Sequence, residues 1–293
     1  MLNPPLSLLS DDLLVSIVEQ LAKLPFAEEE LKNLSLVDRA FTESCQKYIF
    51  RELILVGSGR KISKQLKKVK KVFDDKPSLA NRVRMVQLGI SRQESASLFK
   101  DPNFTSILQM FAKSPVPPHE LHFGGQMSAP LIIEDPILII RQLTKSFFSQ
   151  TLTILRVCEC ANVPLPLFLI CPRLKEVFLD QVGSPEKSYN KYPDNQCSDR
   201  EAPLLEVLEY RNSHSLVKQM IAPPPKFNTP VVLWSKLRVL TLAPHDKQGM
   251  ACLQPILNAA CNTLEELYLT SIHMGKCGVV FLITRSEFDK FLK

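Results

Sequence analysis

The nearest approach to a metal-binding cluster in this sequence is a pair of histidines, His119 and His122, with Glu120 between them. The metal-binding motif H-E-x-x-H places two histidines four residues apart, so that both rings lie on one face of a helix. In this sequence the histidines are three residues apart and follow Pro117 and Pro118. The spacing therefore argues against a metal site, and we expect no metal or other cofactor to be bound.

The eight cysteines likewise show no catalytic or metal-binding pattern. No C-x-x-C pair occurs among them, so the usual spacings of zinc sites and thioredoxin-like redox sites are absent. Cys158 and Cys160 alternate along a predicted strand, so one thiol should face the core and the other should face out. The sequence also contains no phosphate-binding glycine loop, nucleophile elbow or kinase motif set. We therefore expect the protein not to be an enzyme.

Composition and hydropathy predict a soluble intracellular protein. The chain has 293 residues, of which 45% are hydrophobic, enough to bury a sizeable core. Its start lacks the basic region of a signal peptide and carries Asp11 and Asp12 early. No apolar run approaches the roughly 20 residues of a membrane helix. We expect a reducing compartment, cytoplasmic or nuclear, in which the thiols are mostly buried as small apolar groups.

One segment, from Arg60 to Lys76, concentrates the positive charge of the chain. It holds eight basic residues against two acidic ones, which accounts for the whole net charge of +6. Its apolar residues recur at helical spacing and are Ile62, Leu66, Val69 and Phe73. Such a basic amphipathic helix can bind anionic lipid or phosphate, or it can pack its apolar stripe on the next domain and solvate its lysines. We favour packing, and we expect neither nucleic acid nor a membrane as partner, because no aromatic residues are interleaved for base stacking.

Short amphipathic helices are predicted in the first fifty residues. Apolar residues recur at helical spacing from Ser10 to Leu21; Ser10 can cap the helix and Pro25 stops it. A second helical stretch starts near Leu31, and its apolar stripe continues towards Phe50. A module of this size has little core of its own, so a partner or the following domain should cover part of it.

Three segments of this module, in order, resemble the F-box family, in particular F-box-like domains of the fungal type. Residues 9–14, Leu-Ser-Asp-Asp-Leu-Leu, are similar to the family's opening Leu-Pro-x-Glu-Leu-Leu. Residues 34–41 resemble its Leu-x-x-Val-Cys-Arg-x-Phe/Trp segment, and residues 50–53 its closing Trp/Phe-Arg-x-Leu/Ile. Ser10 stands where the family usually has Pro, and Asp38 where it usually has Cys.

The resemblance implies that residues 1–56 form a three-helix F-box-like module that docks the Skp-family adaptor of a cullin-RING ubiquitin ligase. It also implies an adaptor-binding surface, made by Leu9, Leu13, Leu14, Ile17, Leu36, Val37 and Phe41. The alternative is that such residues pack the module's own core. For Leu13, Leu14 and Val37 both interpretations remain open, because one apolar stripe can serve both.

A short motif, apolar-x-x-apolar-x-apolar, recurs along the rest of the chain. Its copies start at Val83, Leu152, Leu174, Leu205, Leu237 and Leu264. From Leu152 onward, successive starts lie 22, 31, 32 and 27 residues apart, with helical stretches between them. The motif resembles leucine-rich repeats, in which stacked strand–helix units bury their leucines in a shared core. The predicted fold class is therefore α/β, with the helical module followed by an irregular solenoid, a curved parallel sheet with outer helices.

The predicted boundaries follow from these patterns. A basic linker helix occupies residues 57–78, and the solenoid occupies residues 79–293, with a flexible polar loop at 183–201. Residues 92–150 show a poor repeat register, with one strand candidate at 120–123 and one helix candidate at 104–111.

The motif also indicates which side chains line the hollow side of the sheet. Because side chains alternate along a strand, residues between and just after the motif leucines face away from the core. The predicted target-binding residues on this face are Arg156, Glu176, Phe178, Asp180, Glu209, Arg211, Glu266 and Tyr268. The face is mildly acidic, and the two rings are either anchors for a partner or are covered by loops.

Together these features predict a substrate-recruiting adaptor subunit of an SCF-type ubiquitin ligase. The module would dock the Skp-family adaptor and its cullin complex, and the repeats would hold an unknown target protein near a separate catalytic subunit. The alternative is a non-ligase repeat scaffold whose N-terminal helices only cap the solenoid. Exposure of the stripe at Leu13 and Leu14 would distinguish the two.

Overall fold

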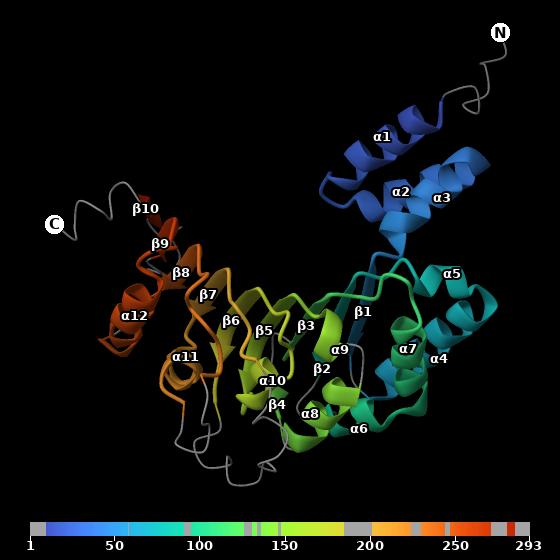
Figure 1. Ribbon diagram of the computed structural model, residues 1–293. Helices are drawn as coiled ribbons and strands as arrows, with labels where there is room; N and C mark the ends of the chain where they lie inside the picture. Colours follow the sequence, from blue (N-terminus) through green and yellow to red (C-terminus); the bar gives the residue numbers. More distant parts are fainter. Residues whose placement is uncertain are drawn as a thin grey trace.

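Figure 1 shows the computed structural model of the chain, in which a small helical module precedes a long curved sheet. The structure describes residues 10–57, 59–90, 95–125, 131–133, 136–145, 148–184, 201–223, 230–243, 247–270 and 280–284. Strands and helices alternate along most of the chain, so the α/β class predicted from the sequence is confirmed. Within the described ranges, no helix combines the length and the apolar character needed to cross a bilayer.

The N-terminal module consists of α1 (Asp11–Ala22), α2 (Ala27–Val37) and α3 (Arg39–Ile49). These helices share a small core that is separate from the core under the sheet. Asp38 caps α3, since its side chain accepts a hydrogen bond from the backbone N–H of Ala40 at 2.9 Å. Ser10 precedes α1, but its side chain makes no capping hydrogen bond; its carbonyl oxygen accepts from Leu13 and Leu14 instead.

The sheet places its strands in the order in which the chain makes them, apart from β4. Its strands are β1 (Glu52–Gly57), β2 (Met85–Ile90), β3 (Glu120–Gly124), β4 (Leu131–Ile132), β5 (Ile154–Ala161), β6 (Glu176–Val182), β7 (Val207–Arg211), β8 (Val239–Ala243), β9 (Glu266–Thr270) and β10 (Val280–Thr284). All neighbours are parallel except β9 and β10, and β4 pairs only with the end of β5. Parallel neighbours require crossover connections, which the helices between them provide.

Helices cover one side of this sheet. They are α4 (Gly59–Asp75), α5 (Pro77–Ala80), α6 (Ser95–Lys100), α7 (Pro102–Ala112), α8 (Pro136–Lys145), α9 (Phe148–Thr151), α10 (Pro166–Leu169), α11 (His214–Ile221) and α12 (Lys247–Ala260). Figure 1 shows them gathered along one side, whereas the other side of the central strands carries no helix in the part of the chain that the structure describes. One continuous apolar core lies between the sheet and the helices.

The strand register follows the sequence motif. The second apolar residues of successive motifs pair across β5 to β9, as Leu155, Val177, Leu208, Leu240 and Leu267. All five side chains are buried against the helices. The predicted alternation of core and outer residues on these strands is therefore confirmed.

Several elements of the sheet domain were not predicted from the sequence. The sequence places residues 52–56 in the helical module, but Glu52–Gly57 form β1 and pair with β2. Between residues 92 and 150 the strand and helix candidates correspond to β3 and α7, whereas α6, β4, α8 and α9 have no counterpart among the predictions. Of the predicted loop at 183–201, residues 185–200 lie outside the described residues.

The basic linker helix is α4, and it packs as expected. Ile62, Leu66 and Phe73 are buried in the core under the sheet. The basic residues of the segment other than Lys70 are exposed, and Lys70 is held in an ion pair with Asp74, its Nζ 2.5 Å from a carboxylate oxygen. The helix therefore contributes an apolar face to the core and a basic ridge to the surface.

Candidate protein-interaction surfaces

The N-terminal module keeps an unusual share of apolar surface uncovered. Of the eleven large hydrophobic residues that are exposed in the described part of the chain, six lie in this module. They are Leu13, Ile17, Leu24, Phe26, Leu36 and Val37. Contiguous exposed apolar surface typically marks sites where another protein binds.

The residues that the sequence assigns to adaptor binding divide into two groups. Leu13 and Ile17 lie one helical turn apart on α1, and Leu36 and Val37 end α2; their exposed fractions range from 43% to 84%. Leu14 and Phe41 are instead buried in the module's own core. Their burial supports the alternative interpretation, in which they pack the module's own core. Leu9 lies outside the described residues.

A second surface is the side of the sheet opposite the helices. Pairing of the strands aligns a central row of side chains across it, made by His122, Arg156, Phe178, Glu209, Thr241 and Tyr268. Two flanking rows contain the remaining residues predicted for target binding, namely Glu176 and Glu266 in one and Asp180 and Arg211 in the other. The structure thus brings all eight predicted residues onto one face.

A charged cluster anchors one part of this face. Glu120 accepts hydrogen bonds from Nε2 of His122 at 2.6 Å and from Nε of Arg156 at 3.3 Å. The guanidinium carbon of Arg156 lies 3.6 Å from the centroid of the Phe178 ring, a cation–π contact. The sequence presents Glu120 and His122 only as a candidate metal site, against which the histidine spacing argues; the structure shows them hydrogen-bonded to each other and, through Glu120, to Arg156 of the central row.

Replacing Glu120 with glutamine is expected to make the protein's stability less sensitive to acid. The free energy of unfolding should fall less on acidification in the variant than in the wild type. Burial raises the pKa of Glu120, but the hydrogen bonds and charges of His122 and Arg156 outweigh it and hold the pKa below its ordinary 4.5. Such a carboxyl contributes stability above its unfolded pKa, and this contribution is lost as the pH falls through the folded pKa. Urea unfolding near neutral pH and at about pH 3 should therefore differ less for Glu120→Gln than for the wild type. An equal difference would mean that the cluster contributes nothing.

A second ion pair fixes the neighbouring strands β6 and β7. Nε of Arg211 donates to Oδ1 of Asp180 at 2.7 Å, and a second contact joins Nη2 to Oδ2. The exposed thiol of Cys158 lies beside this pair on β5. Burial raises the pKa of Cys158, and the charge of Asp180 raises it further. The thiol therefore stays protonated near neutral pH and is a poor nucleophile.

The two aromatic rings of the face remain accessible. Phe178 and Tyr268 are partly exposed, so the described residues do not bury either ring. The hydroxyl of Tyr268 donates to Oε2 of Glu266 at 2.7 Å, which raises the pKa of Tyr268. Rings that are partly packed yet reachable are well suited to anchor a partner, because little side-chain freedom is lost on binding.

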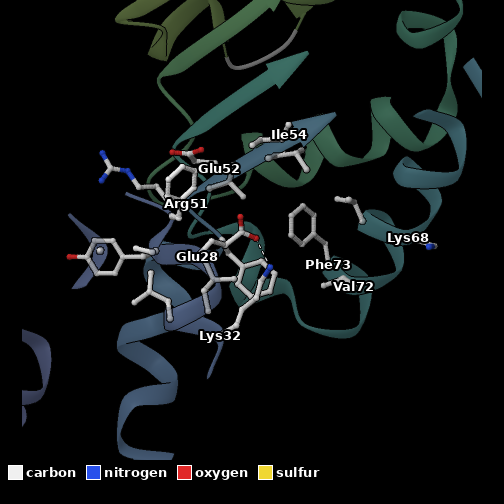
Figure 2. Close-up of a pocket in the computed structure, with 18 of the residues that line it drawn as sticks. Glu28, Lys32, Arg51, Glu52, Ile54, Lys68, Val72 and Phe73 are labelled. Atoms are coloured by element: carbon white, nitrogen blue, oxygen red, sulfur yellow. Dashed lines mark hydrogen bonds and ion pairs between the residues drawn. The ribbon is translucent and has the colours of Figure 1, made fainter. Parts of the chain in front are cut away.

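The structure also forms a groove of about 750 Å³ between α2, β1 and α4. Figure 2 shows Ile54 of β1 and Val72 and Phe73 of α4 around it, with the ion pair of Glu28 and Lys32 on the side of α2. Periodicity in the sequence gives no signal for this groove, because its three walls come from separate segments that meet only through tertiary packing.

Among the described residues, no three His, Cys, Asp or Glu side chains lie close enough together to hold a metal ion. The arrangement consists of surfaces suited to binding: apolar residues on the module, a row of charged and aromatic residues on the sheet, and the groove. Comparisons of the chain with protein-family models, with curated proteins and with solved structures gave no match. What the protein does must therefore be inferred from these surfaces and from the sequence motifs.

Proposed function

We propose that the protein is a non-catalytic adaptor subunit of an SCF-type ubiquitin ligase. In this proposal the N-terminal F-box-like module docks a Skp-family adaptor, and the leucine-rich-repeat-like sheet holds a target protein. The observation that carries the proposal is the exposure of Leu13, Ile17, Leu36 and Val37, which the F-box resemblance independently assigns to the adaptor interface. A module that served only to cap the sheet would gain stability by burying these side chains.

The size of this surface is consistent with the centre of a larger interface. Removing apolar surface from water stabilises a complex by about 25 cal/mol per Å², so each of these side chains can contribute about 1 kcal/mol or more. Specific interfaces bury roughly 1,200–2,000 Å² in total, with a few central residues carrying most of the binding energy. The four residues would be such a centre.

The sheet face supports the second half of the proposal. Arg156 stacked on Phe178, and Tyr268 bonded to Glu266, hold large side chains in fixed positions on a face that helices leave open. Side chains that are already ordered lose little entropy when a partner binds. We infer that the target contacts this row, while a separate subunit of the ligase carries out the chemistry.

Co-purification tests the proposal directly. The full chain, carrying an affinity tag at its C-terminus, is expected to retain a purified Skp-family adaptor on a column and to elute with it as a complex. Size-exclusion chromatography of the mixture should then show a single species larger than either protein.

If no complex forms, the proposed ligase function is wrong. That result would leave the alternative in which the chain is a protein-interaction scaffold and α1–α3 belong to the scaffold itself. The sheet face would keep its role in that case, because no part of its geometry depends on the adaptor.

A further inference from the structure

The first strand of the sheet has an open edge. β1 pairs with β2 on one side, where the carbonyl oxygen of Arg51 accepts the N–H of Met85 at 3.1 Å. Backbone groups alternate sides along a strand, so those of Glu52, Ile54 and Val56 point to the opposite edge. No strand pairs with this edge in the part of the chain that the structure describes. An unpaired row of N–H and C=O groups is a template for a further strand.

The groove between α2, β1 and α4 lies along the first part of this edge, where Glu52, Leu53 and Ile54 line it. Its apolar lining includes Leu24, Phe26, Ile54 and Val72, which are all exposed in the free protein. Figure 2 shows Ile54 and Val72 facing the same hollow from β1 and α4. A strand added to β1 would place every second side chain in this hollow, because side chains alternate along a strand.

Phe26 marks the rim of the groove. It adopts a left-handed backbone conformation, with φ of 65°, and its ring is 92% exposed. A bulky residue rarely adopts this conformation, and strained residues of this kind concentrate at sites that clamp ligands. Phe26 therefore lines the groove without contributing to the core.

A row of lysines on α4 flanks the same edge. Lys68 lines the groove near the start of β1, and the side chain of Lys61 lies against Gly57 at its end. Lys64 lies between them, one helical turn from each. All three are exposed. A segment lying along β1 would therefore run beside three lysines. Glu52 and Glu28, the latter paired with Lys32, also line the groove, so the positive charge that favours carboxylates on the segment is on the side of α4.

We propose that this edge binds an extended acidic segment of a partner protein, which adds to the sheet as a strand next to β1. Its apolar side chains lie beside Ile54, on the open side of the sheet, and its carboxylates point to the other side of the strand, where α4 carries Lys61, Lys64 and Lys68. The main chain supplies affinity, while the groove and the lysines supply specificity. The site lies at the β1 end of the open sheet face, since Ile54 pairs with Gln87 and Gln87 pairs with His122 of the central row. It is separate from the exposed residues assigned to adaptor docking, and it does not depend on the ligase function.

The test uses the full chain and a fluorescent peptide of about eight alternating valine and glutamate residues, long enough to span a strand like β1. Anisotropy should show binding that weakens with salt. A peptide with lysine in place of glutamate, and one of the same composition without alternation, should bind at least about tenfold more weakly.

Two variants and one control distinguish the contribution of the β1 backbone to binding from that of the lysine charges. Ile54→Pro removes an N–H that points away from β2, so the β1–β2 pairing is kept while peptide binding falls about fivefold or more. Ile54→Val keeps the N–H and should bind like the wild type. Replacing Lys61, Lys64 and Lys68 together with glutamine should weaken binding about tenfold at low salt. Circular dichroism melting verifies that each variant is folded.

Three outcomes would overturn the proposal. Equal binding by Ile54→Pro would exclude strand addition, and equal binding of the lysine peptide would exclude charge recognition. Lysines beside an open edge strand, such as these on α4, can also serve only to prevent self-association. If the wild type binds no peptide and the triple glutamine variant dimerises, that protective role is the correct one.

Discussion

Replacing Leu13 and Ile17 together with aspartate is expected to abolish binding of the Skp-family adaptor. Both side chains are exposed on the same face of α1, so the free protein tolerates the change. In the complex, the two carboxylates would be buried in an apolar interface without partners, which costs several kcal/mol. The dissociation constant should therefore rise by at least about 100-fold, as measured by isothermal titration calorimetry with purified adaptor.

The matched control is Val116→Asp. Val116 is 50% exposed, much like Leu13, but it lies in the sheet domain after α7. This variant should bind the adaptor like the wild type. Leu14→Asp is unsuitable because it would place a charge in the core of the module and unfold it. Normal binding by the double variant would mean that the module does not dock through this face of α1.

Truncating Leu179 is expected to produce a large loss of stability. Leu179 is buried on β6 between its strand neighbours Val157 and Tyr210. Leu179→Ala leaves a cavity that the surrounding strands can fill only in part, so the free energy of unfolding should fall by about 2–5 kcal/mol. Urea unfolding followed by circular dichroism measures this change.

Phe178→Ala is the matched control for this experiment. Phe178 is the preceding residue on the same strand, but its ring lies on the open side, under the guanidinium of Arg156. Its loss should cost about 1 kcal/mol or less, the contribution of a partly exposed cation–π contact. If Phe178→Ala unfolds the protein and Leu179→Ala does not, the strand is shifted by one residue and the open face is the core.

The register of the sheet could be predicted because its motif carries the strand period in its spacing. In Leu174, Val177 and Leu179 the last two residues are two apart, so both point to the same side of β6. The residues between and after them, Phe178 and Asp180, are then forced to the other side. A single-residue shift would expose leucines, which makes this prediction strongly constrained.

The exposed apolar surface of the module could be predicted only in part. Leu13 and Leu14 are adjacent, as are Ile17 and Val18, so two apolar stripes run along α1 side by side. Periodicity shows that both stripes exist but does not show which one the other helices cover. Packing against α2 and α3 buries Leu14 and Val18 and leaves Leu13 and Ile17 exposed.

The β1 strand and its groove were not foreseen for a different reason. Glu52–Gly57 alternates in burial, but its first two residues belong to the closing segment of the F-box-like pattern, so the sequence assigned it to the helical module. It becomes a strand only because β2, nearly thirty residues later in the chain, lies beside it. Such pairing between distant segments depends on tertiary contacts, which override local preference.

The number of strands sets the length of the open face, and their order in the sheet allows that number to change. Because the strands from β6 to β9 lie in chain order and each pairs only with its chain neighbours, duplication of one strand–helix unit would insert into the sheet without altering the units on either side. Each added unit would lengthen the central row by one side chain and by about 4.8 Å. The length of the open face is therefore a quantity that gene duplication can adjust one unit at a time, while both ends of the sheet stay unchanged.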